Sequence, residues 1–195
     1  MSQRKSTWGT LPSHGTLLTT AEYLQTAESP RVQELAFGTL RVAESPTAAH
    51  QSLLLELAVA LRAHVLERRL GTIWIAPLDV ILDPARALIV QPDLFFVSTA
   101  RQSMVTDRIW GAPDMVLEVL SPNPRIGKTA ERVGWFASYG VHECWLVHQL
   151  EHEIEILQLD TSGVTARRAF QSTNPIESTV LPDCAMTPAA LAGWS

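Results

Sequence analysis

The chain has 195 residues, of which 46% are apolar, and its formal net charge is −5. This size and composition are typical of one globular domain with a hydrophobic core, and no apolar run approaches the roughly 18 residues that span a bilayer. The negative charge argues against a strong nonspecific grip on nucleic acid, although the local field around a site can still bind it. The two cysteines, Cys144 and Cys184, make no disulfide framework and fit a reduced, cytoplasmic protein.

The N-terminal residues 1–17 contain Ser, Thr, Gly and Pro, without the apolar segment that a secretory signal needs. We therefore expect a disordered tail over 1–17, followed by a single domain over 18–195.

Hydrophobic periodicity and turn residues predict helices and strands along this domain. Thr19 and Glu22 have the spacing of a capping box and predict a short helix through Tyr23 and Leu24. In chain order we expect this helix, strands at 31–37 and 39–43, a long helix at 46–69, strands at 72–76, 79–82, 93–97 and 115–120, a helix at 125–139, strands at 142–147 and 153–157, one or two further short strands, and a small helix near 188–191. This order predicts a mixed α/β (α+β) domain with a central mixed β-sheet flanked by helices.

The strand expected over 115–120 contains a single carboxylate, that of Glu118, and is otherwise apolar. Strand side chains alternate between faces, so Val116, Glu118 and Leu120 share one face of this strand. An ionised carboxylate buried there costs several kcal/mol unless a cation, a metal or hydrogen bonds compensate it. A compensating partner for Glu118 is therefore the main indication of function in the sequence.

Asp93 begins another strongly apolar strand, over 93–97, and is the second carboxylate at a predicted buried strand. Asp93 could instead cap a turn at the strand end, and for Asp114, which follows Pro113, a turn role is the better interpretation. Carboxylates from two neighbouring strands can together hold one Mg²⁺, whose other ligands are water and phosphate oxygens. Such an ion could activate a water molecule and neutralise charge on a phosphodiester.

Positive charge near such a site would come from the helix expected over 125–139. Among the 15 basic residues only Lys5 and Lys128 are lysines, so Lys128 is the only lysine beyond the expected tail. Lys128 and Arg132 are four residues apart and share a helix face, which could position water or stabilise phosphate charge. The alternative is that this basic face is simply solvated.

Three stretches of the chain, taken in order, resemble the Uma-type restriction endonuclease family of the PD-(D/E)XK nuclease superfamily. They are Pro92-Asp93, the run from Gly111 to Pro122, and the run from Tyr139 to Val147. The resemblance extends upstream to residues 20–24, Glu34 and His50, and covers roughly 18–192. It implies a restriction-endonuclease-like fold and Mg²⁺ or Mn²⁺ bound by Asp93 and Glu118, the carboxylates that the burial argument had singled out.

The chain departs from the family pattern at the expected lysine. In many superfamily members a lysine lies two residues after the acid, where this chain has Leu120. The Uma-type family usually carries its lysine on the next helix, and the aligned position holds Arg132, with Phe136 in place of a tyrosine. Arg132 keeps a positive charge but cannot transfer a proton near neutral pH. Lys128, one turn earlier, could take over this role, or the basic face could bind phosphate without cleaving it.

Glu34 and His50 each have two interpretations. The resemblance makes Glu34 a candidate for a further active-site acid, and the alternative is an exposed strand residue. His50 could contact the site, but a histidine near a helix start is more often a cap or a solvated residue. A nucleophilic Cys144 and a zinc site have little support, because neither a glycine turn nor a thiolate pattern accompanies them.

The leading hypothesis is a Mg²⁺- or Mn²⁺-dependent endonuclease that hydrolyses DNA. Asp93 and Glu118 would bind the metal, and Lys128 or Arg132 would supply positive charge. The rival hypothesis, on the same fold, is a catalytically degenerate module that binds nucleic acid or regulates. We expect no membrane partner, and by analogy with the superfamily we expect a homodimer.

Overall fold

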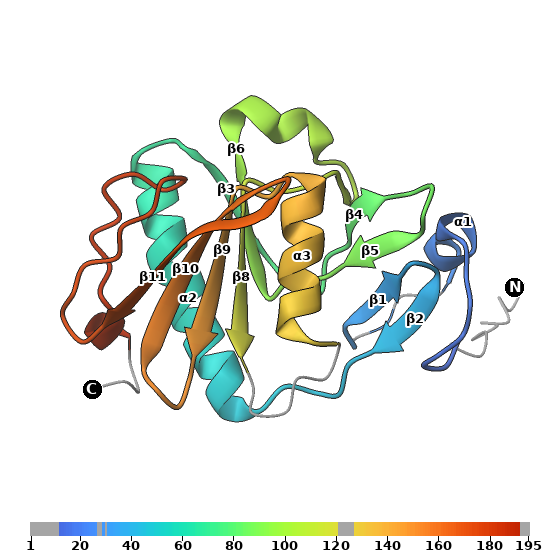
Figure 1. Ribbon diagram of the computed structural model, residues 1–195, viewed down its shortest axis with the longest axis horizontal. Coiled ribbons are helices and arrows are strands. Elements are labelled where there is room, and N and C mark those ends of the chain that lie inside the picture. The colour runs from blue at the N-terminus through green and yellow to red at the C-terminus, as the bar shows by residue number, and fades with distance from the viewer. Residues whose placement is uncertain (1–11, 27–28, 30, 121–126, 192–195) are drawn as a thin grey trace, which may run out of the picture.

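The strands form two sheets, each with parallel and antiparallel pairs, in a computed structural model that describes residues 12–26, 29, 31–120 and 127–191. The larger sheet has the strand order β11-β10-β9-β8-β6-β3, and the smaller sheet has the order β2-β1-β5-β4-β7. Figure 1 shows the smaller sheet beside the larger one, with α1 at its outer end.

The helices are α1 (Thr20–Leu24), α2 (Ala48–Glu67) and α3 (Thr129–Tyr139), with 3₁₀ turns at Thr99–Met104 and Pro188–Ala190. The strands are β1 (Gln33–Ala36), β2 (Thr39–Val42), β3 (Gly71–Ile75), β4 (Val80–Asp83), β5 (Leu88–Val90), β6 (Leu94–Ser98), β7 (Ile109–Trp110), β8 (Met115–Leu120), β9 (Glu143–His148), β10 (Glu153–Asp160) and β11 (Gly163–Gln171). Within the described residues, no helix is long and apolar enough to cross a membrane.

The expected fold class is confirmed, and three features differ from the expectation. The structure has two mixed sheets where one central sheet was expected. The sequence did not indicate β5 and β7, because runs of three and two residues are too short for a periodic signal. β11 has nine residues, longer than expected. The sequence did not indicate this length, because β11 is a mostly exposed edge strand without an apolar pattern.

The expected tail lies largely outside the described residues. In its described part, the backbone of Gly15 donates a hydrogen bond to Leu40 at 2.8 Å, and Thr16 accepts one from Leu40 at 2.8 Å. These residues therefore lie along β2. The capping box of α1 is present, with Thr19 and Glu22 bonded reciprocally.

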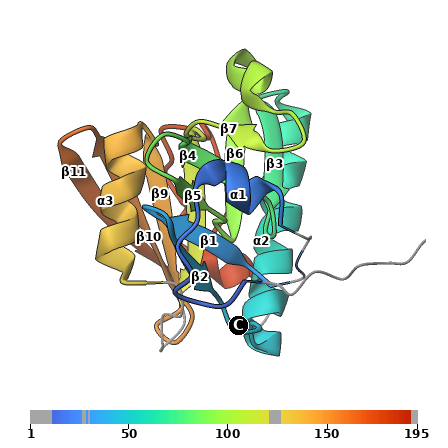
Figure 2. The same cartoon turned by 90° about the vertical axis from the view of Figure 1, so that its right-hand side faces the viewer.

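The larger sheet is covered by α3 on one face and α2 on the other, as Figure 2 shows edge-on. Alternation along β8 explains this arrangement. Val116 packs in the core cluster that contains Phe136 of α3, whereas Leu117 packs in the cluster that contains Leu57 of α2. Because Glu118 lies on the same side of β8 as Val116, its carboxylate is on the α3 side of the sheet.

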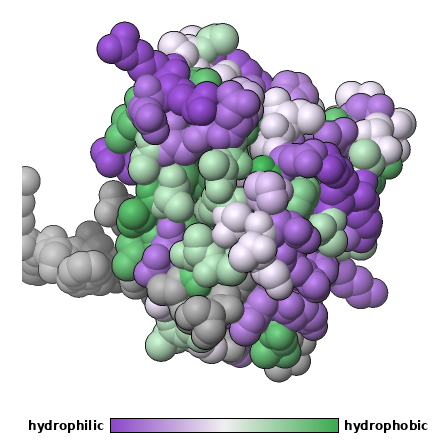
Figure 3. Space-filling view, turned by 90° about the vertical axis from the view of Figure 1, so that its left-hand side faces the viewer, coloured by the Kyte–Doolittle hydropathy of each residue, from purple (hydrophilic) through white to green (hydrophobic). Residues whose placement is uncertain are grey.

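Helix α2 has apolar residues on both sides. The stripe expected from the sequence is buried, including Leu57 and Leu61, which are fully inaccessible. Leu55, Val59 and Leu66 lie on the opposite side of the helix and are exposed. Figure 3 shows one face of the molecule, on which surface hydrophobic residues form a band between hydrophilic areas.

Strand register brings the two candidate carboxylates together. β6 and β8 are antiparallel and pair Leu94 with Leu117, so Asp93, just before β6, is in register with Glu118. Phe95, two residues after Asp93, packs in the α3-side core, which places Asp93 on the same face as Glu118. β9 is parallel to β8 and places Leu146 beside Glu118 on the other side.

A buried carboxylate on the α2 side of the sheet anchors the C-terminal part of the chain. Glu143 of β9 is fully inaccessible and accepts hydrogen bonds from Trp145 Nε1 at 2.6 Å and Ser178 Oγ at 2.5 Å. The backbone N–H and the hydroxyl of Thr179 each donate to its other oxygen at 2.9 Å. These four donors compensate the burial of the charge.

Replacing Glu143 by glutamine should lower the free energy of unfolding by about 1–3 kcal/mol, because the amide would place a donor against these donors. Urea denaturation followed by circular dichroism measures this change. Glu153→Gln is the matched control, since Glu153 of β10 accepts a hydrogen bond from Gln171 at 2.8 Å near the surface. It should change stability by less than about 0.5 kcal/mol. Equal effects of the two variants would contradict the anchoring role.

Candidate active site

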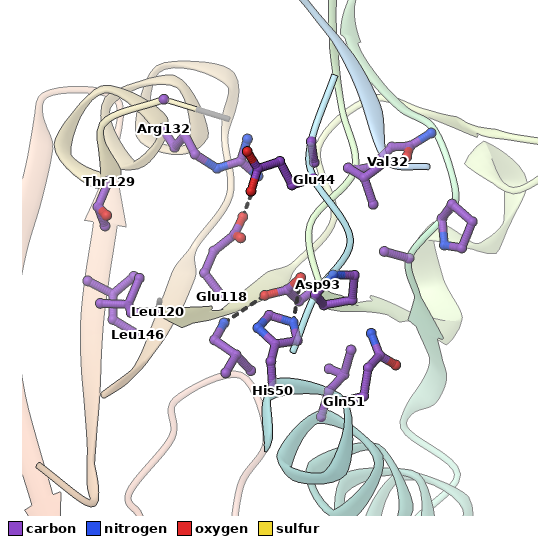
Figure 4. Close-up of a pocket in the computed structure, with 18 of the residues that line it drawn as sticks. Val32, Glu44, His50, Gln51, Asp93, Glu118, Leu120, Thr129, Arg132 and Leu146 are labelled. Atoms are coloured by element: carbon purple, nitrogen blue, oxygen red, sulfur yellow. Dashed lines mark hydrogen bonds and ion pairs between the residues drawn. The ribbon is translucent and has the colours of Figure 1, made fainter. Parts of the chain in front are cut away.

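Asp93 and Glu118 line one pocket, with Asp93 just before β6 and Glu118 on the adjacent strand β8 (Figure 4). Their side chains are 20% and 15% exposed, so both are recessed but reachable. Asp93 Oδ2 accepts a hydrogen bond from the backbone N–H of Val119 at 2.8 Å. This bond fixes the Asp93 carboxylate against the strand that carries Glu118.

Arg132 of α3 enters the same site from the helix side. Its side chain is 8% exposed, and its Nη2 donates to Glu118 Oε1 at 2.5 Å. Its Nη1 donates to Glu34 Oε2, and the guanidinium lies over the Phe136 ring, 5.6 Å from the ring centroid. The compensating partner that the buried Glu118 required is therefore, within the protein itself, Arg132.

Glu34 is held from two sides. It is 1% exposed, so the alternative of an exposed strand residue is wrong. While Oε2 accepts from Arg132, Oε1 accepts the backbone N–H of Gln91 at 2.7 Å. The side-chain amide of Gln91 donates in turn to Asp79 at 2.7 Å. The smaller sheet thereby supplies a fixed carboxylate to the guanidinium on α3.

Lys128 and Arg132 occupy different environments despite their spacing. Lys128 is the exposed N-cap residue of α3. Its ammonium makes no hydrogen bond to the described residues, and Lys128 does not line the pocket, although its neighbours Gly127 and Thr129 do. The structure brings together Glu34, Asp93, Glu118 and Arg132, and it leaves Lys128 at the helix start.

His50 lies at the site, although the sequence favoured a helix cap or a solvated residue at this position. It is 7% exposed and lines the pocket, with Nε2 3.4 Å from Asp93 Oδ1. Its backbone N–H is capped by the Thr47 hydroxyl at 3.2 Å. The spacing of His50 to Leu53, Leu54 and Leu57, all buried, was the available signal, because it puts His50 on the inner face of α2.

The sequence favoured a turn role for Asp114, but its carboxylate bonds across to the end of β6 and to the 3₁₀ turn that follows it. Its Oδ2 accepts the backbone N–H of Ser98 at 2.7 Å, and its Oδ1 accepts from Arg101 at 3.3 Å. Asp114 does not line the pocket.

The pocket has a volume of about 230 Å³ and is bounded by both sheets, the start of α2 and the inner side of α3. Most of its wall is apolar. The apolar residues that line it are Val32, Ala43, Pro46, Leu54, Ala76, Pro77, Val119, Leu120, Val133, Phe136 and Leu146. Acidic and basic groups thus face a recessed and largely apolar cavity, where charge interactions are stronger than at an open surface.

Burial raises the pKa of Glu118 to about 8, and the charges of Asp93 and Glu34 add to this rise while Arg132 opposes it. For Arg132, burial by itself would lower the pKa, but the charges of Glu118 and Glu34 and their hydrogen bonds outweigh it and raise the pKa above its usual range. Arg132 therefore stays cationic at neutral pH. With a pKa of about 8, Glu118 changes its protonation state near neutral pH.

The carboxyl groups of the site outnumber its fixed positive charge. Those of Glu34, Asp93 and Glu118 face the single guanidinium of Arg132, and Glu118, whose pKa is raised to about 8, keeps its proton over much of the neutral range. A bound divalent cation would favour the ionised form of Glu118, and carboxylate oxygens are the ligands that Mg²⁺ prefers. Within the described residues, no group of three or more His, Cys, Asp or Glu side chains could hold a metal ion. The residues present fit a cation held by two carboxylates, with water or substrate oxygens as its remaining ligands.

The pKa of Glu118 predicts how stability depends on pH without divalent metal. Between its ordinary value of 4.5 and about 8, the folded protein keeps a proton that the unfolded chain has released. This contribution to stability is complete below pH 4.5 and is lost as the pH rises to about 8. We expect the stability difference between wild type and Glu118→Gln to fall by up to about 1.4 kcal/mol per pH unit in this window. Urea unfolding at several pH values measures this, and a difference that rises with pH would contradict it.

Comparison with known proteins places this chain in a family. Residues 20–189 match the Uma2 family, described as "Putative restriction endonuclease". Because the match spans most of the chain, the protein belongs to the Uma2 family.

The fold is similar to one solved structure in particular, described as "Crystal structure of a putative nuclease belonging to DUF820 from Anabaena variabilis ATCC 29413". The two share 17% sequence identity with a TM-score of 0.75, over 91% of this chain and 98% of that chain. At this identity the likeness supports the fold. A comparison with curated protein sequences found no match.

Proposed function

We propose that this protein is a nuclease that hydrolyses DNA phosphodiester bonds with Mg²⁺ or Mn²⁺ held by Asp93 and Glu118. The observation that carries the proposal is the pair of recessed carboxyl groups, Asp93 and Glu118, in a site where three carboxyl groups face one guanidinium. Membership of a family described as "Putative restriction endonuclease" supports the same class of activity. The same description supports the choice of DNA as the proposed substrate.

The bound metal would activate a water molecule and neutralise charge on the phosphate. In the hydrolysis, the water oxygen bonds to phosphorus as a bond from phosphorus to an ester oxygen breaks, and a water proton ends on the leaving oxygen. Asp93 is oriented for its ligand role by the Val119 N–H, and Glu118 by Arg132.

Arg132 is suited to stabilise negative charge, not to carry protons. Its guanidinium is cationic throughout the working pH range and is fixed by two carboxylates and by Phe136. A substrate phosphate near Glu118 would lie close to this positive charge. Of the two basic candidates, Arg132 is the one whose position supports this role, because Lys128 is exposed and outside the pocket wall.

The ion pair between Arg132 and Glu118 also favours a second candidate function. A guanidinium that already binds Glu118 at 2.5 Å competes with a metal for that carboxylate. A protein in which this pair persists would bind nucleic acid or regulate without cleaving it.

Two measurements on purified protein separate these functions. An active nuclease cuts plasmid DNA when Mn²⁺ or Mg²⁺ is added, and its melting temperature rises with Mn²⁺ because the ion binds only the folded state. Protein that shows neither cleavage nor a melting shift with either ion would favour the non-catalytic module. A homodimer is part of the proposal by analogy and is measured by sedimentation.

A further inference from the structure

The shape of the pocket limits which form of DNA can reach the proposed metal ligands. Asp93 and Glu118 are 20% and 15% exposed, and both open onto the cavity of about 230 Å³. Taking a base out of a duplex and into a recess costs pairing and stacking free energy, and this cost is least for a base that is already unpaired. An unpaired strand has no such restriction.

The wall of the cavity matches a nucleobase better than a sugar-phosphate backbone. Val32, Leu54 and Phe136 are among the apolar side chains that line it. Bases that leave a duplex stack are held between apolar or aromatic side chains and read along their polar edges. Gln51 also lines the cavity and carries an amide that can bond to such an edge, whereas the amide of Gln91 is already bonded to Asp79.

Positive charge lies where flanking phosphates would pass. Arg31 lines the cavity and is exposed, and Lys128 is exposed between two lining residues. Contacts to phosphates from a few such cations position a strand without reading its sequence. The described part of the chain therefore offers cations at the edge of the cavity and an apolar wall inside it.

Resting on the proposed nuclease function, we infer that the substrate is DNA that is unpaired at the cleaved bond. The base of a single-stranded or extrahelical nucleotide enters the cavity against its apolar wall, and the adjoining phosphate reaches Asp93 and Glu118. Intact duplex is then a poor substrate.

The first test compares three labelled oligonucleotides of one sequence: a single strand, a blunt duplex, and a duplex with one unpaired nucleotide. Affinity is measured by fluorescence anisotropy with Ca²⁺, and cleavage is measured with Mn²⁺. We expect the single strand and the bulged duplex to bind at least ten-fold more tightly than the blunt duplex and to be cut faster. A blunt duplex that is bound and cut as well as the single strand would overturn the inference and leave the nuclease proposal intact.

The affinity measurement distinguishes a failure of the inferred substrate from a failure of the proposed nuclease activity. Preferential binding of unpaired DNA without cleavage by either ion supports the inferred ligand and rejects the nuclease. No measurable binding or cleavage of any of the three oligonucleotides rejects both.

A matched pair of variants tests whether the strand passes through the cavity. Gln51 and Ser52 are adjacent exposed residues of α2, and only Gln51 lines the cavity. Gln51→Glu and Ser52→Glu add the same charge at the surface, so folding and long-range electrostatics change equally. We expect Gln51→Glu to weaken single-strand affinity at least five-fold and Ser52→Glu less than two-fold. Equal effects would show that the strand binds elsewhere.

Discussion

Replacing Glu118 by glutamine should reduce Mn²⁺-dependent DNA cleavage by about 100-fold or more. Glutamine keeps the shape of the side chain and an acceptor for Arg132, but it lacks the charge that a hard divalent cation requires. Asp93→Asn should have a similar effect, because Asp93 provides the other proposed ligand from the neighbouring strand. Initial rates of plasmid relaxation at saturating Mn²⁺ measure both changes.

A readout that does not depend on catalysis accompanies this prediction. The rise in melting temperature on adding Mn²⁺ should largely disappear in Glu118→Gln, since the ion stabilises only through the site that it binds. Glu153→Gln is the control, because Glu153 is a half-buried strand carboxylate that does not line the pocket. It should keep both cleavage and the melting shift. If Glu118→Gln kept more than half of the wild-type rate, Glu118 would not be a metal ligand.

Replacing Arg132 by methionine should lower the free energy of unfolding by about 3–5 kcal/mol near pH 8. Methionine roughly fills the volume, but it leaves the buried Glu34 without its cation and Glu118 with a nearby like charge. The loss should be smaller at pH 5, where Glu118, with its pKa of about 8, is protonated and adds no charge to the site. Urea unfolding at pH 5 and pH 8 measures the difference.

Three further variants make the Arg132 result specific. Lys128→Met removes an exposed charge from the same helix and should change stability by less than about 0.5 kcal/mol. Combining Glu34→Gln with Arg132→Met removes the carboxylate charge of Glu34 that Arg132 no longer neutralises. This double variant should recover part of the lost free energy of unfolding. Arg132→Lys keeps one positive charge but cannot hold both carboxylates in the same fork geometry, so it should fall between wild type and Arg132→Met. An Arg132→Met protein as stable as wild type at pH 8 would contradict the ion-pair network.

The cleavage rates of these variants distinguish the two basic candidates. If Arg132 stabilises phosphate charge, Arg132→Met should lose cleavage while Lys128→Met keeps it. The opposite result would show that Lys128 performs the task from the helix start, after a movement toward the pocket.

The sequence by itself determined the strands that carry Asp93 and Glu118 and the face on which Glu118 lies. A strand has a side-chain period of two, so the position of a carboxylate in an apolar run fixes the face of the strand on which it lies. Burying its charge among apolar residues costs free energy, and the need for a partner followed from that cost. Helix α3 and its end at Gly140, which has a left-handed φ of 94°, were likewise predictable, because these signals are local.

Only the tertiary structure decided which partner Glu118 has and which other residues join it. Glu34 and Arg132 are 98 residues apart, and their contact depends on how the smaller sheet packs against α3. Lys128 and Arg132 had equal standing in the sequence, because helical spacing gives a shared face but not the direction of that face. Packing of Val133 and Phe136 in the core turns Arg132 inward, since the apolar stripe of α3 has only one orientation that buries it. Lys128 does not share that face, because it is the N-cap residue with an extended backbone and stands before the first turn of the helix.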